Sequence, residues 1–198
     1  LSDKVGRGTD YASPESLVAV IRKVIKYVLQ GLQGTNYPVS YPEQSDVLNN
    51  YMKLLLNSTE PVHKRVYPKD FMGPSSSTLQ IRNIVPPDDA NNIPNVRVNY
   101  TVTDKADGYR KLMFISSKGL IYLINTNMNV EFTGSFTENK DIFNSIIDGE
   151  YVSNDKYNNF INLYIAFDIY FINNKNITGY PFIQLSGDET MKEKKQDQ

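Results

Sequence analysis

The spacing of apolar residues changes along the chain, and this change most constrains what the chain can fold into. In residues 13–34 apolar side chains recur every three or four positions, which is the period of a helix with one apolar face. Ser13 is the predicted N-cap, and Pro14 lies in the first turn, where its missing N–H costs nothing. The helix is predicted to end at Gly31 or Gly34.

A second helix is predicted to begin near Ser45 or Asp46 and to run through the stretch VLNNYMKLLL. Its spacing places four apolar side chains on one face: Leu48, Tyr51, Met52 and Leu55. Because an apolar face of this kind normally packs against other elements, we expect both helices to contribute to the core.

After the connector that follows these helices, apolar residues alternate or form short runs, as they do in strands. The alternation in VRVNYTV predicts a strand with Val98, Tyr100 and Val102 on one face. KLMFI and LIYLI flank a Ser-Ser-Lys-Gly turn and are predicted to form a hairpin. Two further strands are predicted at Ile146–Val152 and Asn162–Ile172, and the apolar character of the second predicts that both its faces are covered.

The combined pattern predicts an α+β fold in which N-terminal helices precede a twisted antiparallel sheet. The predicted organisation is a helical segment in residues 1–60, an irregular connector in 61–95, a sheet domain in 96–185 and a flexible charged tail in 186–198. The connector is rich in proline, glycine, serine and asparagine, and one short strand is predicted inside it at Ser77–Ile84.

Composition excludes several classes of site. The chain has no cysteine, which rules out disulfides and thiolate metal sites. His63 is the only histidine and is expected in a solvated loop, so a histidine-based triad or zinc site is not expected. The formal net charge of -1 gives no general attraction for nucleic acid and leaves a local basic groove compatible with it. No apolar run approaches the ~18 residues of a membrane span, so we expect a soluble, intracellular protein with no membrane partner.

The stretch TDKADGYRKLMFI places a lysine at the start of a predicted strand. Lys105 stands two residues before Asp107, and Gly108 allows a tight turn or a close approach of the backbone to a ligand. A lysine amine becomes an effective nucleophile when its pKa is lowered. From these residues alone two interpretations stay open: a nucleophile beside a pocket, or a surface turn with a solvated lysine.

Two later motifs change the balance between these interpretations. An Asp-Gly-Glu sequence ends at Glu150, and Phe167 precedes Asp168 in the last long strand. Taken alone, Glu150 would be a solvated carboxylate and Phe167 a core side chain. In this order, however, the three pieces resemble the motifs of covalent nucleotidyltransferases, the family of mRNA capping guanylyltransferases and ATP-dependent polynucleotide ligases. Residues 105–110 match every fixed position of its K-x-D-G-x-R motif.

The resemblance implies a role for each residue of that first motif. Lys105 would attack the α-phosphate of a nucleoside triphosphate, expel pyrophosphate and form a lysyl-N-nucleoside monophosphate. Arg110 would contact the ribose or a phosphate of the bound nucleotide through its forked donors. Asp107 would orient the lysine, and Gly108 would line the nucleotide site.

The resemblance also implies roles for the two later motifs. Glu150 would hold the ribose hydroxyls or act as a ligand of Mg²⁺ or Mn²⁺, because these cations prefer carboxylate and phosphate oxygens. Phe167 would stack on the base. The sheet region would then be a partial nucleotidyltransferase domain of the ligase and capping-enzyme type. It would be truncated, because complete members carry a further acidic motif, a lysine motif and an OB-fold after the part that Phe167 and Asp168 resemble.

Within this family the sequence resembles the capping guanylyltransferases of large DNA viruses. The resemblance rests on Thr103–Ile115 with its following hairpin, on the GPSSSTL stretch at 73–79 and on residues 24–41. It implies transfer of GMP from GTP to a 5′-diphosphate RNA end. Two alternatives stay open: the adenylation domain of an ATP-dependent DNA or RNA ligase, and a non-catalytic nucleic-acid-binding or virion module of the same fold.

The resemblance also implies partners and a location. The 5′ end of mRNA would be the acceptor, and triphosphatase and methyltransferase modules would belong to a longer polypeptide. We expect this chain alone to be unable to complete catalysis. A viral capping enzyme would act in the cytoplasm, in a viral factory, or would be packaged in the virion.

Overall fold

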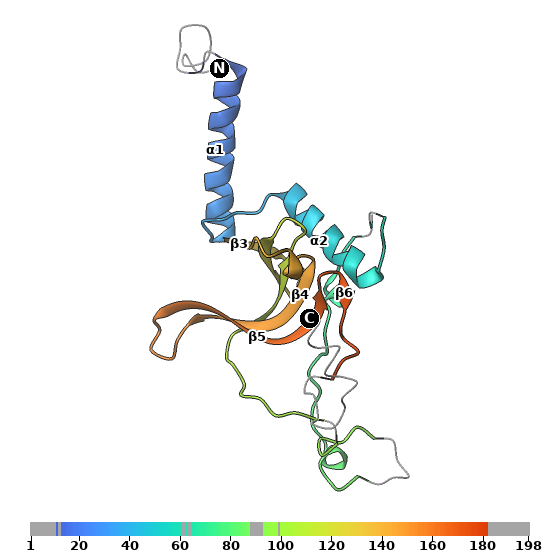
Figure 1. Ribbon diagram of the computed structural model, residues 1–198. Coiled ribbons are helices and arrows are strands. Elements are labelled where there is room, and N and C mark those ends of the chain that lie inside the picture. Colours follow the sequence, from blue (N-terminus) through green and yellow to red (C-terminus); the bar gives the residue numbers. More distant parts are fainter. Residues whose placement is uncertain are drawn as a thin grey trace.

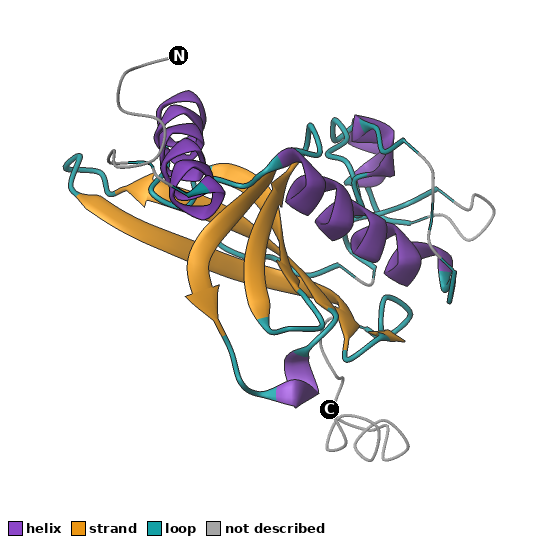
Figure 2. Ribbon diagram, turned by 90° about the horizontal axis from the view of Figure 1, so that it is seen from above, coloured by secondary structure: helices purple, strands orange, loops and turns teal. Residues whose placement is uncertain are grey.

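The computed structural model describes residues 11, 13–60, 62, 65–87, 93–98 and 100–181. It confirms the α+β class: two helices precede a six-stranded antiparallel sheet with the strand order β3-β2-β1-β4-β5-β6 (Figures 1 and 2). His63 and the predicted tail 186–198 lie outside the described residues, and the four-part division of the chain stays a prediction. No helix in the described ranges is long and apolar enough to cross a membrane.

The elements follow one another with short turns in the second half of the chain. The helices and strands are α1 Pro14–Gln33, α2 Tyr41–Leu56, β1 Tyr109–Ile115, β2 Leu120–Asn125, β3 Val130–Phe136, β4 Ser145–Asn154, β5 Phe160–Ile172 and β6 Lys175–Asn176. Short 3-10 helices lie at Pro68–Asp70, Ile81–Asn83 and Lys140–Ile142.

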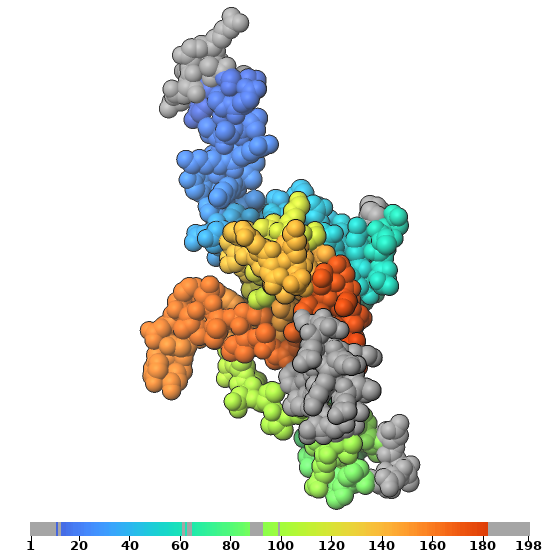
Figure 3. All heavy atoms as spheres, in the orientation of Figure 1, coloured from blue at the N-terminus to red at the C-terminus, as the bar shows by residue number. Residues whose placement is uncertain are grey.

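Helix α1 has the predicted ends. The Ser13 hydroxyl accepts a hydrogen bond from the Ser16 amide at 3.2 Å, and Gly34 ends the helix with a φ of 62°. The expectation that α1 packs into the core is wrong. It contains no buried residue, and Ile21 and Val24 on its apolar face are 48% and 55% exposed. The reason is visible in Figures 1 and 3, where α1 points away from the sheet instead of lying along it.

Helix α2 begins at Tyr41, earlier than predicted, because Ser40 caps it and Pro42 occupies its first turn. Its predicted apolar face is confirmed. Tyr51 and Met52 are buried, and Leu48 and Leu55 pack against the same cluster. This face covers one end of the sheet (Figure 2), where Leu112, Phe114, Ile124 and Ile146 are fully buried. The helix therefore belongs to the same hydrophobic core as the sheet.

The predicted hairpin is confirmed as β1 and β2, and the two longer predicted strands as β4 and β5. Two other strand predictions are wrong. The described residues of VRVNYTV form no strand, and Val102 is fully exposed. The predicted strand Ser77–Ile84 contains instead a 3-10 helix at Ile81–Asn83. The sheet explains the first error, because β1 already pairs with β2 on one edge and with β4 on the other.

The prediction that β5 is covered on both faces is also wrong. Its last residues Tyr170 and Phe171 reach the core, whereas Leu163 and Ile165 are 47% and 38% exposed. The start of β5 pairs with the end of β4 as a two-stranded ribbon that extends beyond the remaining strands (Figure 1). The long apolar run of β5 therefore does not mark a buried strand, because one face of β5 is exposed to solvent over most of its length.

Candidate functional site

Lys105 lies in the extended segment that leads into β1. Its side chain is 82% exposed, and its ammonium forms an ion pair with the carboxylate of Asp107, which is 95% exposed. The hydrogen bond from this pair and the negative charge of Asp107 raise the pKa of Lys105, and Glu150 adds a smaller electrostatic contribution in the same direction. The same pair lowers the pKa of Asp107. In this structure Lys105 is thus accessible and favours its protonated form.

Arg110 stands at the start of β1 and pairs with a buried carboxylate. Its Nε donates to Oδ1 of Asp148 at 3.1 Å, and its Nη2 donates to Oδ2 at 2.5 Å. The Asp148 side chain is fully buried, and its hydrogen bond with Arg110 raises the pKa of the guanidinium. A bidentate pair of this kind fixes both side chains in one orientation.

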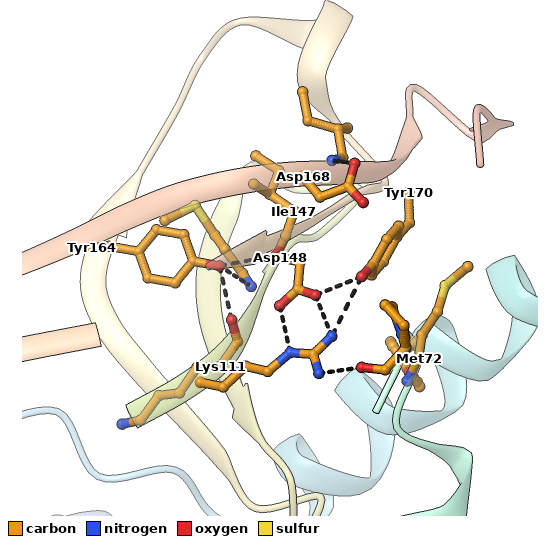
Figure 4. A network of polar contacts seen from close by, with 12 residues as sticks. Met72, Lys111, Ile147, Asp148, Tyr164, Asp168 and Tyr170 are labelled. Carbon is orange, nitrogen blue, oxygen red and sulfur yellow. Dashed lines mark hydrogen bonds and ion pairs between the residues drawn. The ribbon is translucent and has the colours of Figure 1, made fainter. Parts of the chain in front are cut away.

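Tyr170 completes this network from β5. Its hydroxyl donates to Oδ2 of Asp148 at 2.5 Å, a contact drawn in Figure 4. Burial, followed by the hydrogen bond to Asp148, raises the pKa of the Tyr170 hydroxyl, so the phenol stays neutral. Sequence reasoning assigned no role to Asp148 or Tyr170. Asp148 could have been found as the first residue of the Asp-Gly-Glu motif, whereas nothing in the sequence marks Tyr170.

Glu150 lies directly opposite Arg110 in the ladder between β1 and β4. Directly paired residues in antiparallel strands project from the same face of a sheet, so Arg110, Glu150 and Asp148 share one face. Asp148 is already engaged by Arg110, and within the described ranges no group of three or more carboxylate or histidine side chains converges as a ready metal site. A divalent cation would therefore need oxygen ligands from a bound nucleotide in addition to Glu150.

Phe167 lines a cavity of about 390 Å³ together with Arg110 and Asp148. The connector residues Pro74–Ser76 and the threonines Thr101 and Thr103 line the same cavity. The Phe167 side chain is 39% exposed, so its ring is available for a ligand to contact. Lys105 and Glu150 are not among the lining residues, although Thr103 lies two positions before Lys105.

The structure therefore brings the predicted site residues together in two groups. Lys105 contacts Asp107 beside Glu150, and Arg110 shares a cavity with Phe167. The pairing of Arg110 with Glu150 across the ladder connects the two groups. The individual roles of these residues stay predictions.

The glycines of both motifs are required by close packing. A Cβ on Gly108 would collide with the carbonyl oxygen of Tyr151 and would lie 3.0 Å from Cγ of Glu150. A Cβ on Gly149 would lie 2.5 Å from the ring of Tyr164, whose hydroxyl donates to Ile147 at 2.9 Å (Figure 4). Each glycine thus lets a neighbouring strand approach closely beside a motif carboxylate.

Gly149→Ala is expected to destabilise the fold by about 1–3 kcal/mol, because the added methyl must displace the half-buried ring of Tyr164. Gly31→Ala is the matched control, since a Cβ on this helical glycine meets nothing within 4 Å. We expect it to be neutral or stabilising. Urea denaturation followed by circular dichroism measures both changes. Equal stabilities of the two variants would contradict the packing argument.

Comparisons with known proteins place the chain in a family. The family model described as "mRNA capping enzyme, catalytic domain" matches residues 90–188, which is half of the chain. The probable mRNA-capping enzyme of Acanthamoeba polyphaga mimivirus is 29% identical over 140 residues, which cover 71% of this chain and 10% of the relative. The matched part is thus a tenth of that relative's length. With the motifs, the antiparallel sheet and the family match in agreement, the chain belongs to the mRNA capping enzyme catalytic-domain family.

Proposed function

We propose that this chain carries the nucleotide-binding face and the nucleophile of an mRNA guanylyltransferase. The observation that supports this most is the pairing of Arg110 with Glu150 on one sheet face. Arg110 lines the cavity that Phe167 also lines, and Glu150 contributes to the electrostatics of the exposed Lys105. A nucleotide whose base contacts Phe167 would then extend its phosphates toward Lys105. Family membership favours GTP over ATP as the nucleotide.

In the proposed reaction the neutral amine of Lys105 attacks the α-phosphorus of GTP. A P–N bond forms, the bond between the α-phosphorus and the bridging oxygen breaks, and pyrophosphate leaves with the electron pair. The amine must lose a proton to solvent before attack, because the ion pair lowers the pKa of Asp107 and holds the lysine as an ammonium. GMP would then pass from lysine to the terminal phosphate of a 5′-diphosphate RNA, which restores the amine.

Mg²⁺ or Mn²⁺ would neutralise the phosphate charge during this attack. Glu150 would share such a cation with the nucleotide or hold the ribose hydroxyls, and its position opposite Arg110 in the ladder supports this role. Asp107 and Gly108 would form the turn that presents Lys105 to the phosphates. The RNA acceptor, the triphosphatase and methyltransferase modules, and a location in a viral factory or virion belong to the same proposal.

Acceptor transfer tests this function directly. The longest polypeptide that contains these 198 residues would be incubated with labelled GTP and a divalent cation, freed of excess nucleotide, and mixed with 5′-diphosphate or 5′-monophosphate RNA. We expect label to move only to the diphosphate RNA. If ATP instead adenylylated the protein, and the adenylylated protein sealed a nicked strand with a 5′-monophosphate, the result would contradict the proposal and favour a ligase.

The pH dependence of the first step tests the role of Asp107. Since attack requires the neutral amine and Asp107 raises the pKa of Lys105, the rate of adduct formation is expected to increase with pH. Asp107→Asn removes the charge that favours the ammonium, so the rising limb should move to lower pH. Asp104→Asn, which removes a nearby carboxylate outside the ion pair, should move it less. Single-turnover rates from about pH 6 to pH 10 measure this, and identical profiles for the three proteins would refute the assignment.

A further inference from the structure

The connector segment Asp70–Ser76 forms part of the cavity wall, although it precedes the residues 90–188 that match the family. Pro74, Ser75 and Ser76 line the cavity that Phe167 also lines, and Met72 and Gly73 line a neighbouring cavity of about 710 Å³ that shares Phe167. Most of this segment has no regular secondary structure. Its position therefore depends on side-chain contacts from other elements.

The first anchor of the segment comes from α2. The hydroxyl of Tyr51 donates to the carbonyl oxygen of Asp70 at 2.8 Å and accepts from the amide of Met72 at 2.8 Å. Tyr51 is fully buried. One hydroxyl thus bonds two backbone groups of the half-buried segment and ties them to α2.

The second anchor comes from the sheet. Nη1 of Arg110 donates to the carbonyl oxygen of Pro74 at 2.6 Å, and the guanidinium lies 5.5 Å from the ring centre of Phe71. Asp148 and Tyr170 hold the rest of the guanidinium through Nε and Nη2. Four of the five N–H groups of Arg110 are therefore used within the described part of the chain.

Gly73 lets the segment pass close to this second anchor. Its φ is 115°, a value that side-chain-bearing residues rarely adopt. A Cβ at this position would collide with Nη2 of Arg110 and would lie 2.6 Å from the Tyr170 hydroxyl. The segment and the network of Arg110, Asp148 and Tyr170 thus fit together only with glycine here.

We propose that Tyr51 and Tyr170 are positioning residues that hold Asp70–Ser76 as a wall of the purine-nucleotide cavity, with Arg110 and Asp148 as the link to the sheet. The proposal rests on the proposed function. It makes α2 and the connector parts of the nucleotide site. It also gives Arg110 a main role in holding the wall, with one N–H left for the nucleotide among the contacts described.

Tyr51→Phe and Tyr170→Phe test the proposal, because each removes one hydroxyl and keeps the ring. Tyr122→Phe is the matched control: Tyr122 is also buried between α2 and the sheet, and its hydroxyl donates to Glu43 at 3.0 Å without touching the segment. We expect faster hydrogen exchange in both test variants at the amide of Met72, which donates to Tyr51. We also expect about five- to tenfold weaker binding of a fluorescent GTP analogue, as loss of one or two hydrogen bonds implies. Tyr122→Phe should change neither.

Unchanged exchange at the Met72 amide in both test variants would overturn the proposal. Faster exchange with unchanged nucleotide affinity would overturn the positioning role while leaving the proposed function intact. A third outcome is faster exchange in the variants together with no nucleotide binding by the wild-type protein. It would overturn the proposed function and, with it, the role of the wall in nucleotide binding.

Discussion

Lys105→Ala is expected to abolish the covalent nucleotide adduct while leaving the fold and non-covalent nucleotide binding intact. The side chain is 82% exposed and its one ionic partner, within the described residues, is the equally accessible Asp107, so its removal leaves the core unchanged. Lys105→Arg should also form no adduct, because a guanidinium does not give up its proton under these conditions.

The control for this prediction is Lys118→Ala, which removes an exposed lysine at the turn between β1 and β2. Adduct formation in this variant should equal that of the wild type. Nucleotide binding, measured with the fluorescent GTP analogue, should be similar in all four proteins. An adduct that persists in Lys105→Ala at the wild-type level would show that another side chain is the nucleophile.

Asp148→Ala is expected to give the largest loss of stability, about 3 kcal/mol in the free energy of unfolding. Removing one partner of a buried ion pair leaves the other without its counter-charge, and costs of this kind run from about 3 to 5 kcal/mol. We place the loss at the lower end because Arg110 keeps 27% of its side chain exposed and can be partly hydrated. Tyr170 would also lose its hydrogen-bond acceptor.

Urea denaturation of the 198-residue chain measures this loss, with Asp107→Asn as the control. Asp107 also forms an ion pair, but the side chains of Asp107 and Lys105 are both exposed to solvent. Removing the charge of Asp107 should therefore leave the denaturation midpoint unchanged. A midpoint for Asp148→Ala equal to that of the control would mean that the buried pair contributes no stability. Asp148→Asn, which keeps the shape and loses the charge, should fall between the two.

Local patterns in the sequence predict the elements whose partners are close along the chain. The hairpin of β1 and β2 has alternating apolar residues on both sides of a short turn, and its strands pair in the expected antiparallel way. The start of α1 at Ser13 likewise follows from a local capping interaction. The motifs that contain Lys105 and Glu150 are local in the same sense, because each is a short run of fixed residues.

The errors concern interactions between distant parts of the chain. VRVNYTV has a strand-like pattern, but β1 has no free edge for it, and this depends on how β2 and β4 pair. The apolar face of α1 predicts burial, but the helix points away from the sheet. The contacts of Tyr51 with Met72 and of Tyr170 with Asp148 join residues that are 21 and 22 positions apart, and a single tyrosine carries no sign of its partner.

The most direct test of the central claim is the identity and position of a covalent adduct on the wild-type protein. The longest polypeptide that contains this chain would be incubated with Mg²⁺ or Mn²⁺ and either GTP or ATP, and its intact mass would be measured before peptide mapping. We expect one GMP adduct from GTP, located on Lys105, and none from ATP. An AMP adduct, a GMP adduct on another residue, or no adduct from a folded protein would each contradict the guanylyltransferase assignment.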